Sequence, residues 1–176
     1  MTSTATTTEP TEGACAYVIG EDGLATWSDM HAEAWIGMVE TYKQLTRALE
    51  SELDSEHGLS LSGLELLGRL ASADGHHLRL SALATASGLS LSRASRIVDV
   101  LESRRLVARQ SYEGDRRAVE AHLTDSGLTL TRRARATHFA SVRRRFFDKL
   151  APAEVEALAG VFGRFAPRAA EACTSD

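Results

Sequence analysis

Five arginines stand within residues 103–127, although the whole chain carries a net charge of −4. Two of them, Arg116 and Arg117, directly follow the turn-forming sequence Glu113-Gly114-Asp115. A guanidinium group stays charged at neutral pH and forms paired hydrogen bonds with carboxylate or phosphate oxygens. A local basic surface attracts anions whatever the net charge of the chain. This stretch therefore predicts contact with an anionic partner.

A second set of candidate anion-binding residues lies just before this stretch. Residues 81–86 and 91–105 have helical patterns, and Ser87-Gly88-Leu89 between them predicts a tight turn, because glycine accepts the positive φ that the turn requires. With the apolar positions facing inward, the outer face of the second helix carries hydroxyls and arginines: Ser92, Arg93, Ser95 and Arg96. Arginine can read guanine edges in a major groove, and hydroxyls can contact phosphates. Taken alone, the pattern also fits a helical hairpin whose charged face is solvated.

The segment after these helices has the periodicity of a β-hairpin. Val119, Ala121 and Leu123 alternate with their neighbours, and residues 106–112 can form the opposing strand. A helix-turn-helix followed by such a wing predicts a winged helix-turn-helix lobe that binds double-stranded DNA. On an extended strand Asp115 and Arg117 share a side, so Asp115 is expected to position Arg117 for the minor groove. Arg116 would then face a phosphate or solvent.

Long helical segments flank the predicted lobe. Apolar residues recur at helical spacing over 27–53, a helix is expected from Thr124 towards Leu150, and Pro152 opens a last one. One small lobe cannot bury so long an apolar stripe, so a second copy of the chain is expected to pack against it. The fold class is therefore mainly α with a small β-hairpin wing: a winged helix-turn-helix lobe plus long helices that form a dimerisation domain. The expected parts are a disordered, acidic and Thr-rich arm (1–24), a helical dimerisation region (25–58 and 124–172) and a DNA-binding lobe (59–123).

These features resemble the MarR family of transcriptional regulators. The resemblance covers roughly residues 27–168 and is carried by "LSRASRIVDVLESRRLVARQ", "EGDRRAVEAHLTDSG" and "LAPAEVEAL". Its most specific part is Asp-Arg-Arg, followed by alternating residues and Leu-Thr-x-x-Gly. The resemblance implies a triangular homodimer with interleaved terminal helices above two winged-helix lobes. It also implies repression that a small molecule or oxidation relieves. The N-terminal arm is longer than many members carry.

Other kinds of site find little support in the sequence. It contains no Gly-rich phosphate loop, no HExxH and no nucleophile elbow, so no catalytic residue, cofactor or enzymatic activity is expected. No two of the six histidines stand at i, i+4 on one helix, which favours surface histidines over metal ligands. Cys15 and Cys173 stand alone near opposite ends and are expected to be free thiols rather than redox sensors.

An organic effector is the switch that the family resemblance most commonly implies. A candidate effector pocket between the dimer helices and the lobe would be lined by aromatic and polar residues: Trp27, His31, Trp35, Glu65 and Arg69. The competing interpretation is that both tryptophans pack in the core or at the dimer interface.

The remaining expectations concern location and the choice of function. No apolar run approaches the ~20 residues that cross a bilayer, and no secretory signal pattern is present, so a cytoplasmic protein without membrane contact is expected. The rival hypothesis to DNA binding is a winged-helix protein-interaction module that does not bind DNA. Such a module need not keep Arg93, Arg96, Arg116 and Arg117 together. DNA binding is therefore favoured.

Overall fold

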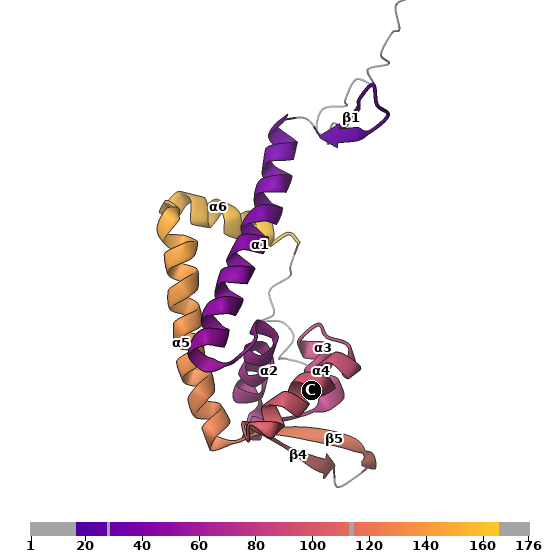
Figure 1. The fold of residues 1–176 in the computed structure, drawn as a ribbon, viewed down its shortest axis with the longest axis vertical. Helices are drawn as coiled ribbons and strands as arrows, with labels where there is room; N and C mark the ends of the chain where they lie inside the picture. The colour runs from indigo at the N-terminus through magenta and orange to yellow at the C-terminus, as the bar shows by residue number, and fades with distance from the viewer. Residues whose placement is uncertain (1–16, 28, 113–114, 166–176) are drawn as a thin grey trace, which may run out of the picture. The chain divides into compact units, whose positions relative to one another are not determined.

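The computed structural model describes residues 17–27, 29–112 and 115–165 (Figure 1). The chain divides into two compact units, Met1–Arg47 and Ala48–Asp176. The division falls within the first long helix, α1 (Asp29–His57), so this helix contributes residues to both units. Among the described residues, no helix combines the length and the apolar character needed to span a membrane.

The N-terminal unit opens with a short β-hairpin. β1 (Tyr17–Ile19) pairs antiparallel with β2 (Ala25–Trp27), and the rings of Tyr17 and Trp27 meet edge to face with centroids 6.3 Å apart. Gly23 closes the turn at φ 77°. The expectation of a disordered arm over 1–24 therefore does not hold for residues 17–24, while residues 1–16 lie outside the described part. The hairpin escaped sequence reasoning because strands of three residues give almost no periodic signal.

The second unit contains a winged helix-turn-helix lobe, as the sequence predicts. Three helices lie beside a small antiparallel sheet whose strand order is β3-β5-β4 (Figure 1). The helices are α2 (Leu61–Ser72), α3 (Leu80–Ala86) and α4 (Leu91–Ser103), and the strands are β3 (His77–Arg79), β4 (Val107–Tyr112) and β5 (Asp115–Leu123). The sequence did not predict β3, which pairs only with β5. The wing is therefore joined to the lobe by a third strand.

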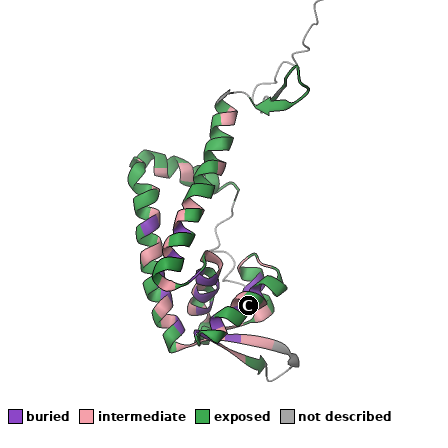
Figure 2. Ribbon diagram, in the orientation of Figure 1, coloured by how far each residue is buried: buried purple, intermediate pink, exposed green. Residues whose placement is uncertain are grey.

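The core of the lobe is made of leucine, valine and alanine side chains from its helices and sheet. Leu66, Leu67 and Leu70 of α2 are fully buried, and they pack in one cluster with Leu83 of α3 and Val98 of α4. In Figure 2, part of the lobe helices is coloured as buried. Burying side chains of this size contributes about 1.5–3 kcal/mol each, so the cluster fixes how α4 sits on the lobe.

Hydroxyl side chains cap two helices of the lobe, α2 and α4, and the helix that starts at residue 125. Ser60 accepts a hydrogen bond from the Gly63 amide (3.0 Å), Ser90 from the Arg93 amide (3.3 Å) and Thr124 from the Gly127 amide (3.0 Å). These bonds satisfy amides that have no partner within a helix. Between α3 and α4 the chain turns at Gly88, whose φ of 62° is the positive value that the sequence predicts. The turn and the start of α4 are therefore defined locally by one glycine and one cap.

A long helix, α5 (Asp125–Arg145), leaves the end of the wing. The Leu106 carbonyl, at the start of the wing, accepts hydrogen bonds from the Thr124 amide (3.1 Å) and the Thr124 hydroxyl (3.1 Å). The first turn of α5 packs so closely on this carbonyl that a Cβ at Gly127 would overlap it and would lie 2.8 Å from Leu123 Cδ1. The Leu-Thr-x-x-Gly motif thus has a physical reason: its threonine bonds the carbonyl, and its glycine lets the helix approach.

The last helix, α6 (Pro152–Phe162), begins at a proline, as expected, after a short 3-10 turn over Phe147–Lys149. Large apolar side chains on α5, the turn and α6 remain exposed: Phe139, Phe147, Val161 and Phe162. On the N-terminal unit, α1 also exposes large apolar side chains: Met30, Trp35, Ile36, Met38 and Tyr42.

A carboxylate holds the C-terminal part of α1 to α5. Glu52 accepts hydrogen bonds from the Ser141 hydroxyl (2.6 Å), Arg144 (2.7 Å) and Arg145 (3.2 Å). These bonds, that of Ser141 first, lower the pKa of Glu52 from 4.5 to about 2. One turn further along, His57 shares a hydrogen bond of 2.9 Å with Thr137. Two arginines of α5, Arg144 and Arg145, are therefore part of a helix-to-helix contact.

Replacing Glu52 with glutamine should lower the free energy of unfolding by roughly 1–2 kcal/mol at pH 7, because charged hydrogen bonds are lost. The folded-state pKa lies below the unfolded one, so this stabilisation is complete above about pH 5 and fades as the pH falls towards 2. Urea unfolding at pH 7 and pH 3 should show the two proteins converging at low pH. Glu65→Gln, in an exposed pair with Arg69, is the control and should change little. A pH-independent difference would contradict this interpretation of Glu52.

Candidate nucleic-acid interface

Helix α4 buries one side and presents the opposite side to solvent. Ala94, Val98 and Leu101 point into the core. At about 100° per residue, the side opposite to them carries Ser92, Arg96 and Ser103, and all three are exposed. Arg93 is also exposed but lies on one flank, and the half-buried Ser95 lies on the other flank. The four α4 residues singled out from the sequence thus divide between an outer face and two different flanks.

Arg109 of the wing is bonded to the Ser95 flank of α4. Its guanidinium donates to the Asp99 carboxylate, to the Ser95 carbonyl (2.9 Å) and to the Ser95 hydroxyl (3.1 Å), and its own amide donates to Glu102 (3.1 Å). The side chain is only 26% exposed, so these bonds are partly shielded from water. Arg109 thereby offsets two carboxylates on the helix that would otherwise face a polyanion. Ser95 accepts from Arg109 and keeps its own hydroxyl hydrogen to donate.

The sequence pattern did not distinguish Arg109 from the other arginines of residues 103–127, and it did not indicate this contact with α4. The signal that could have revealed it is the acidic pair on α4. Asp99 and Glu102 lie on a helix that is expected to meet DNA, so they need a neighbouring positive charge. Arg109, the arginine of the next strand, β4, could supply that charge.

The wing is a two-stranded antiparallel ladder whose pairing changes near its tip. The register runs from Val107 opposite Leu123 to Ser111 opposite Val119, and then shifts so that Tyr112 faces Asp115. Glu113 and Gly114 lie outside the described residues. For Asp115, Arg116 and Arg117 the structure describes the backbone alone, within β5. The expected pairing of Asp115 with Arg117 stays a prediction.

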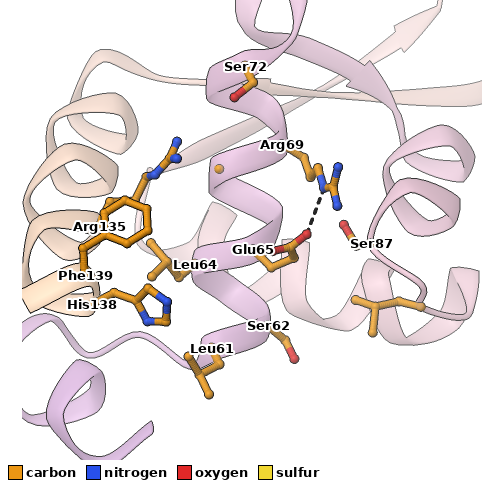
Figure 3. A pocket seen from close by; sticks show the side chains of 12 residues that line it. Leu61, Ser62, Leu64, Glu65, Arg69, Ser72, Ser87, Arg135, His138 and Phe139 are labelled. Atoms are coloured by element: carbon orange, nitrogen blue, oxygen red, sulfur yellow. Dashed lines mark hydrogen bonds and ion pairs between the residues drawn. The ribbon is translucent and has the colours of Figure 1, made fainter. Parts of the chain in front are cut away.

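A separate open pocket of about 570 Å³ lies over the outward face of α2. Figure 3 shows Glu65 and Arg69 joined by an ion pair on one side of α2, and His138, Phe139 and Arg135 of α5 on the other. Burial, and then the charge of Arg135, lower the pKa of His138, so its imidazole is neutral at physiological pH. Its Nδ1 is buried and has no hydrogen-bond partner among the described residues. The pocket thus combines the apolar ring of Phe139 with polar side chains, those of Glu65, Arg69 and His138.

Two of the residues proposed from the sequence for an effector pocket, Glu65 and Arg69, line the pocket over α2. Trp27, His31 and Trp35 belong to the N-terminal unit, where both tryptophans are substantially exposed. Sequence reasoning did not single out His138 and Phe139, because their neighbourhood depends on how α5 packs against α2. In the described part of the chain, no three His, Cys, Asp or Glu side chains gather as metal ligands, and Cys15 and Cys173 lie outside it.

Comparison with known proteins assigns the chain to a family. Residues 57–118 match the sequence model of the MarR family. The regulator AbsC of Streptomyces coelicolor is 36% identical, with 80% of this chain and 94% of that chain covered and a TM-score of 0.73. Sco3205 from the same organism, a MarR family transcriptional regulator solved in complex with DNA, is 27% identical (81% and 95% covered, TM-score 0.73).

More distant structures share the fold alone. BldR of Sulfolobus solfataricus is 21% identical, with 77% of this chain and 96% of that chain covered and a TM-score of 0.63. Among curated proteins, none matches the sequence significantly. With a winged helix-turn-helix lobe, long flanking helices and 36% identity across nearly the whole of AbsC, the chain belongs to the MarR family of transcriptional regulators.

Proposed function

We propose that this chain represses transcription by binding a specific DNA sequence as a homodimer, and that it is not an enzyme. The observation that carries the proposal is the exposed surface of α4. Its outer face carries Arg96 and one flank carries Arg93, and neither arginine has an ion-pair partner among the described residues. Arg109 offsets the charge of the acidic residues on the same helix. A helix with exposed, unpaired arginines and neutralised acids suits the major groove of DNA, where arginine reads guanine edges. That the relative Sco3205 was solved in complex with DNA supports the same function.

The proposed DNA contacts come from two elements of the lobe. Ser92, Arg93, Ser95 and Arg96 on α4 would meet the major groove and its edges, and Asp115, Arg116 and Arg117 on the wing would meet the adjacent minor groove. Ser95 would act while still accepting from Arg109. We propose residues 59–123 as the DNA-binding lobe.

We propose that residues 25–58 and 124–172 supply the dimer contacts. The exposed apolar side chains of α1, α5 and α6 support this, because a soluble chain rarely leaves so many uncovered. A two-fold dimer presents its two recognition helices about one DNA turn apart, so the operator would be a pseudo-palindrome. A dimer bound over a promoter blocks access to it, which makes repression the simplest outcome.

The test is a band-shift titration of the purified chain on DNA from upstream of its own gene, with random-sequence competitor. We expect a competitor-resistant complex that contains two protomers per duplex, as measured by analytical ultracentrifugation. A dimer that shows no preference for any upstream or selected sequence would support the rival function, a winged-helix protein-interaction module. A monomer at micromolar concentration would contradict the dimer.

We further propose that a small organic effector releases the DNA by binding over α2. The exposed ring of Phe139, with Glu65, Arg69 and His138 also lining the pocket, supports a ligand that has both an aromatic surface and a polar group. A compound bound there should raise the unfolding midpoint of the wild-type protein and lower its DNA affinity. Phe139→Ala and His138→Ala should remove both responses. A compound that acts on both variants as strongly as on the wild-type protein would place the effector site elsewhere.

A further inference from the structure

A small basic hollow lies between α4 and the junction of α1 with α2. Its volume is about 260 Å³, and three arginines of α4 and its C-cap line it, namely Arg93, Arg96 and Arg104. The opposite wall is the backbone around Gly58 and Ser60 at the start of α2. No carboxylate lines the hollow. Apolar side chains make up much of the lining, and its charged residues are the three arginines, so the hollow favours an anion over a cation.

One of the three arginines is fixed, and the other two are not. Arg104 donates to the His57 carbonyl (2.9 Å) and to the Gly58 carbonyl, so its position is set by the C-terminus of α1. Within the described residues, the guanidinium groups of Arg93 and Arg96 make no hydrogen bond or ion pair, although the Arg93 amide is bonded to Ser90. Two exposed guanidinium groups beside a fixed third one can therefore close on a ligand without breaking any internal bond.

The helix geometry separates Arg93 from Arg96. At about 100° per residue, Val100 and Arg104 each fall within about 20° of Arg93 along one flank, and Arg96 lies about 60° from Arg93 towards the outer face. The major groove is about 12 Å wide and an α-helix with side chains is 10–12 Å across, so the flanks of an inserted helix face the phosphates and its outer face meets the bases. The other flank of α4 is already closed by Arg109.

We infer that this hollow binds one phosphate of the DNA backbone, with Arg93 as its ligand and Arg104 as a fixed positive charge behind it. Arg96 is then the base-reading arginine of α4. The inference rests on the proposed DNA binding and refines it, because the sequence analysis treated Arg93 and Arg96 as equivalent. A phosphate held on this flank sets the depth and register of α4 in the groove, while carrying no sequence information itself.

The test compares Arg93→Ala and Arg96→Ala on a duplex selected from a random-sequence pool and on an unselected duplex, over a series of salt concentrations. Arg93→Ala should weaken binding to both duplexes by the same factor and lower the slope of log affinity against log salt by about one unit. Arg96→Ala should reduce the preference for the selected duplex by about 5- to 150-fold, the loss expected for one base-reading pair. Arg132→Ala, an exposed arginine of α5, is the control of equal charge change and should leave the preference unchanged and the slope nearly so.

Lysine variants separate the two roles a second time. A phosphate accepts a lysine as a point charge, whereas paired hydrogen bonds to a guanine edge depend on the guanidinium geometry. Arg93→Lys should therefore retain most of the affinity and the salt slope, and Arg96→Lys should still lose preference. If Arg93→Ala erases the preference with an unchanged slope, the phosphate site is overturned while the proposed function stands. If the wild-type chain selects no duplex at all, both the phosphate site and the proposed sequence-specific DNA binding are contradicted.

Discussion

Replacing Gly127 with alanine is expected to lower the free energy of unfolding by roughly 2–3 kcal/mol, the range for forcing extra volume into a packed site. The added Cβ would overlap the Leu106 carbonyl oxygen and would lie 2.8 Å from Leu123 Cδ1. The obstructing atom belongs to the backbone, so a rotamer change cannot relieve the overlap. Because Leu106 and Leu123 are the first and last residues around the wing, the damage should reach the wing itself.

Gly68 offers a matched control within a neighbouring helix. A Cβ there would meet nothing within 4 Å, so Gly68→Ala should stabilise α2 by up to about 1 kcal/mol through helix propensity alone. Urea or thermal unfolding of the two variants measures the contrast directly. At this chain length the Gly127 variant should melt roughly 5–10 °C lower than the wild type. Similar midpoints for the two variants would mean that α5 does not pack on Leu106 as described.

Replacing Arg109 with alanine should weaken binding to a selected DNA duplex by on the order of 10- to 100-fold, because placing like charges together costs several kcal/mol at an interface. The change exposes Asp99 and Glu102, whose charges Arg109 offsets. It also removes the bonds that join β4 to the Ser95 end of α4. Both effects act on DNA binding, although Arg109 need not touch the DNA.

A double variant separates the two effects of Arg109. Arg109→Ala combined with Asp99→Ala removes most of the repulsion, so it should recover part of the lost affinity. Arg133→Ala, an exposed α5 arginine, has the same charge change as Arg109→Ala and should alter affinity only slightly. Fluorescence anisotropy of labelled duplex at fixed salt provides the measurement. If Arg109→Ala behaves like Arg133→Ala, the arginine contributes only to the general field.

The sequence predicted the elements that are defined by local signals. Helical patterns flank Gly88, which supplies a positive φ, and Thr124 is a cap residue before another helical pattern. The two helices of the helix-turn-helix, the turn between them and the start of α5 could therefore be placed to within a few residues. The strand β3 could not be predicted in this way. It has three residues, and it exists because His77, Leu78 and Arg79 find partners on β5, more than forty residues later.

In the candidate site, too, local patterns were predictable and contacts between distant segments were not. Types and spacing were sufficient to place Arg93 and Arg96 on the exposed side of α4. They could not reveal that Arg109 binds Asp99, because that contact depends on how β4 crosses the helix. His138 was likewise unpredictable as a pocket residue, since its burial arises from the packing of α5 beside α2.

The close contact of Leu106, Thr124 and Gly127 couples the motion of α5 to that of the wing. Two hydrogen bonds to one carbonyl and the lack of a side chain at Gly127 leave little room for the wing to rotate relative to α5. α5 has 21 residues and is therefore about 30 Å long, so a tilt of about 5° displaces one end by roughly 2.6 Å relative to the other. That displacement approaches the 3.4 Å step between base pairs. Under the proposed function, a small change in the angle of α5 would therefore shift the wing by a large part of one base-pair step.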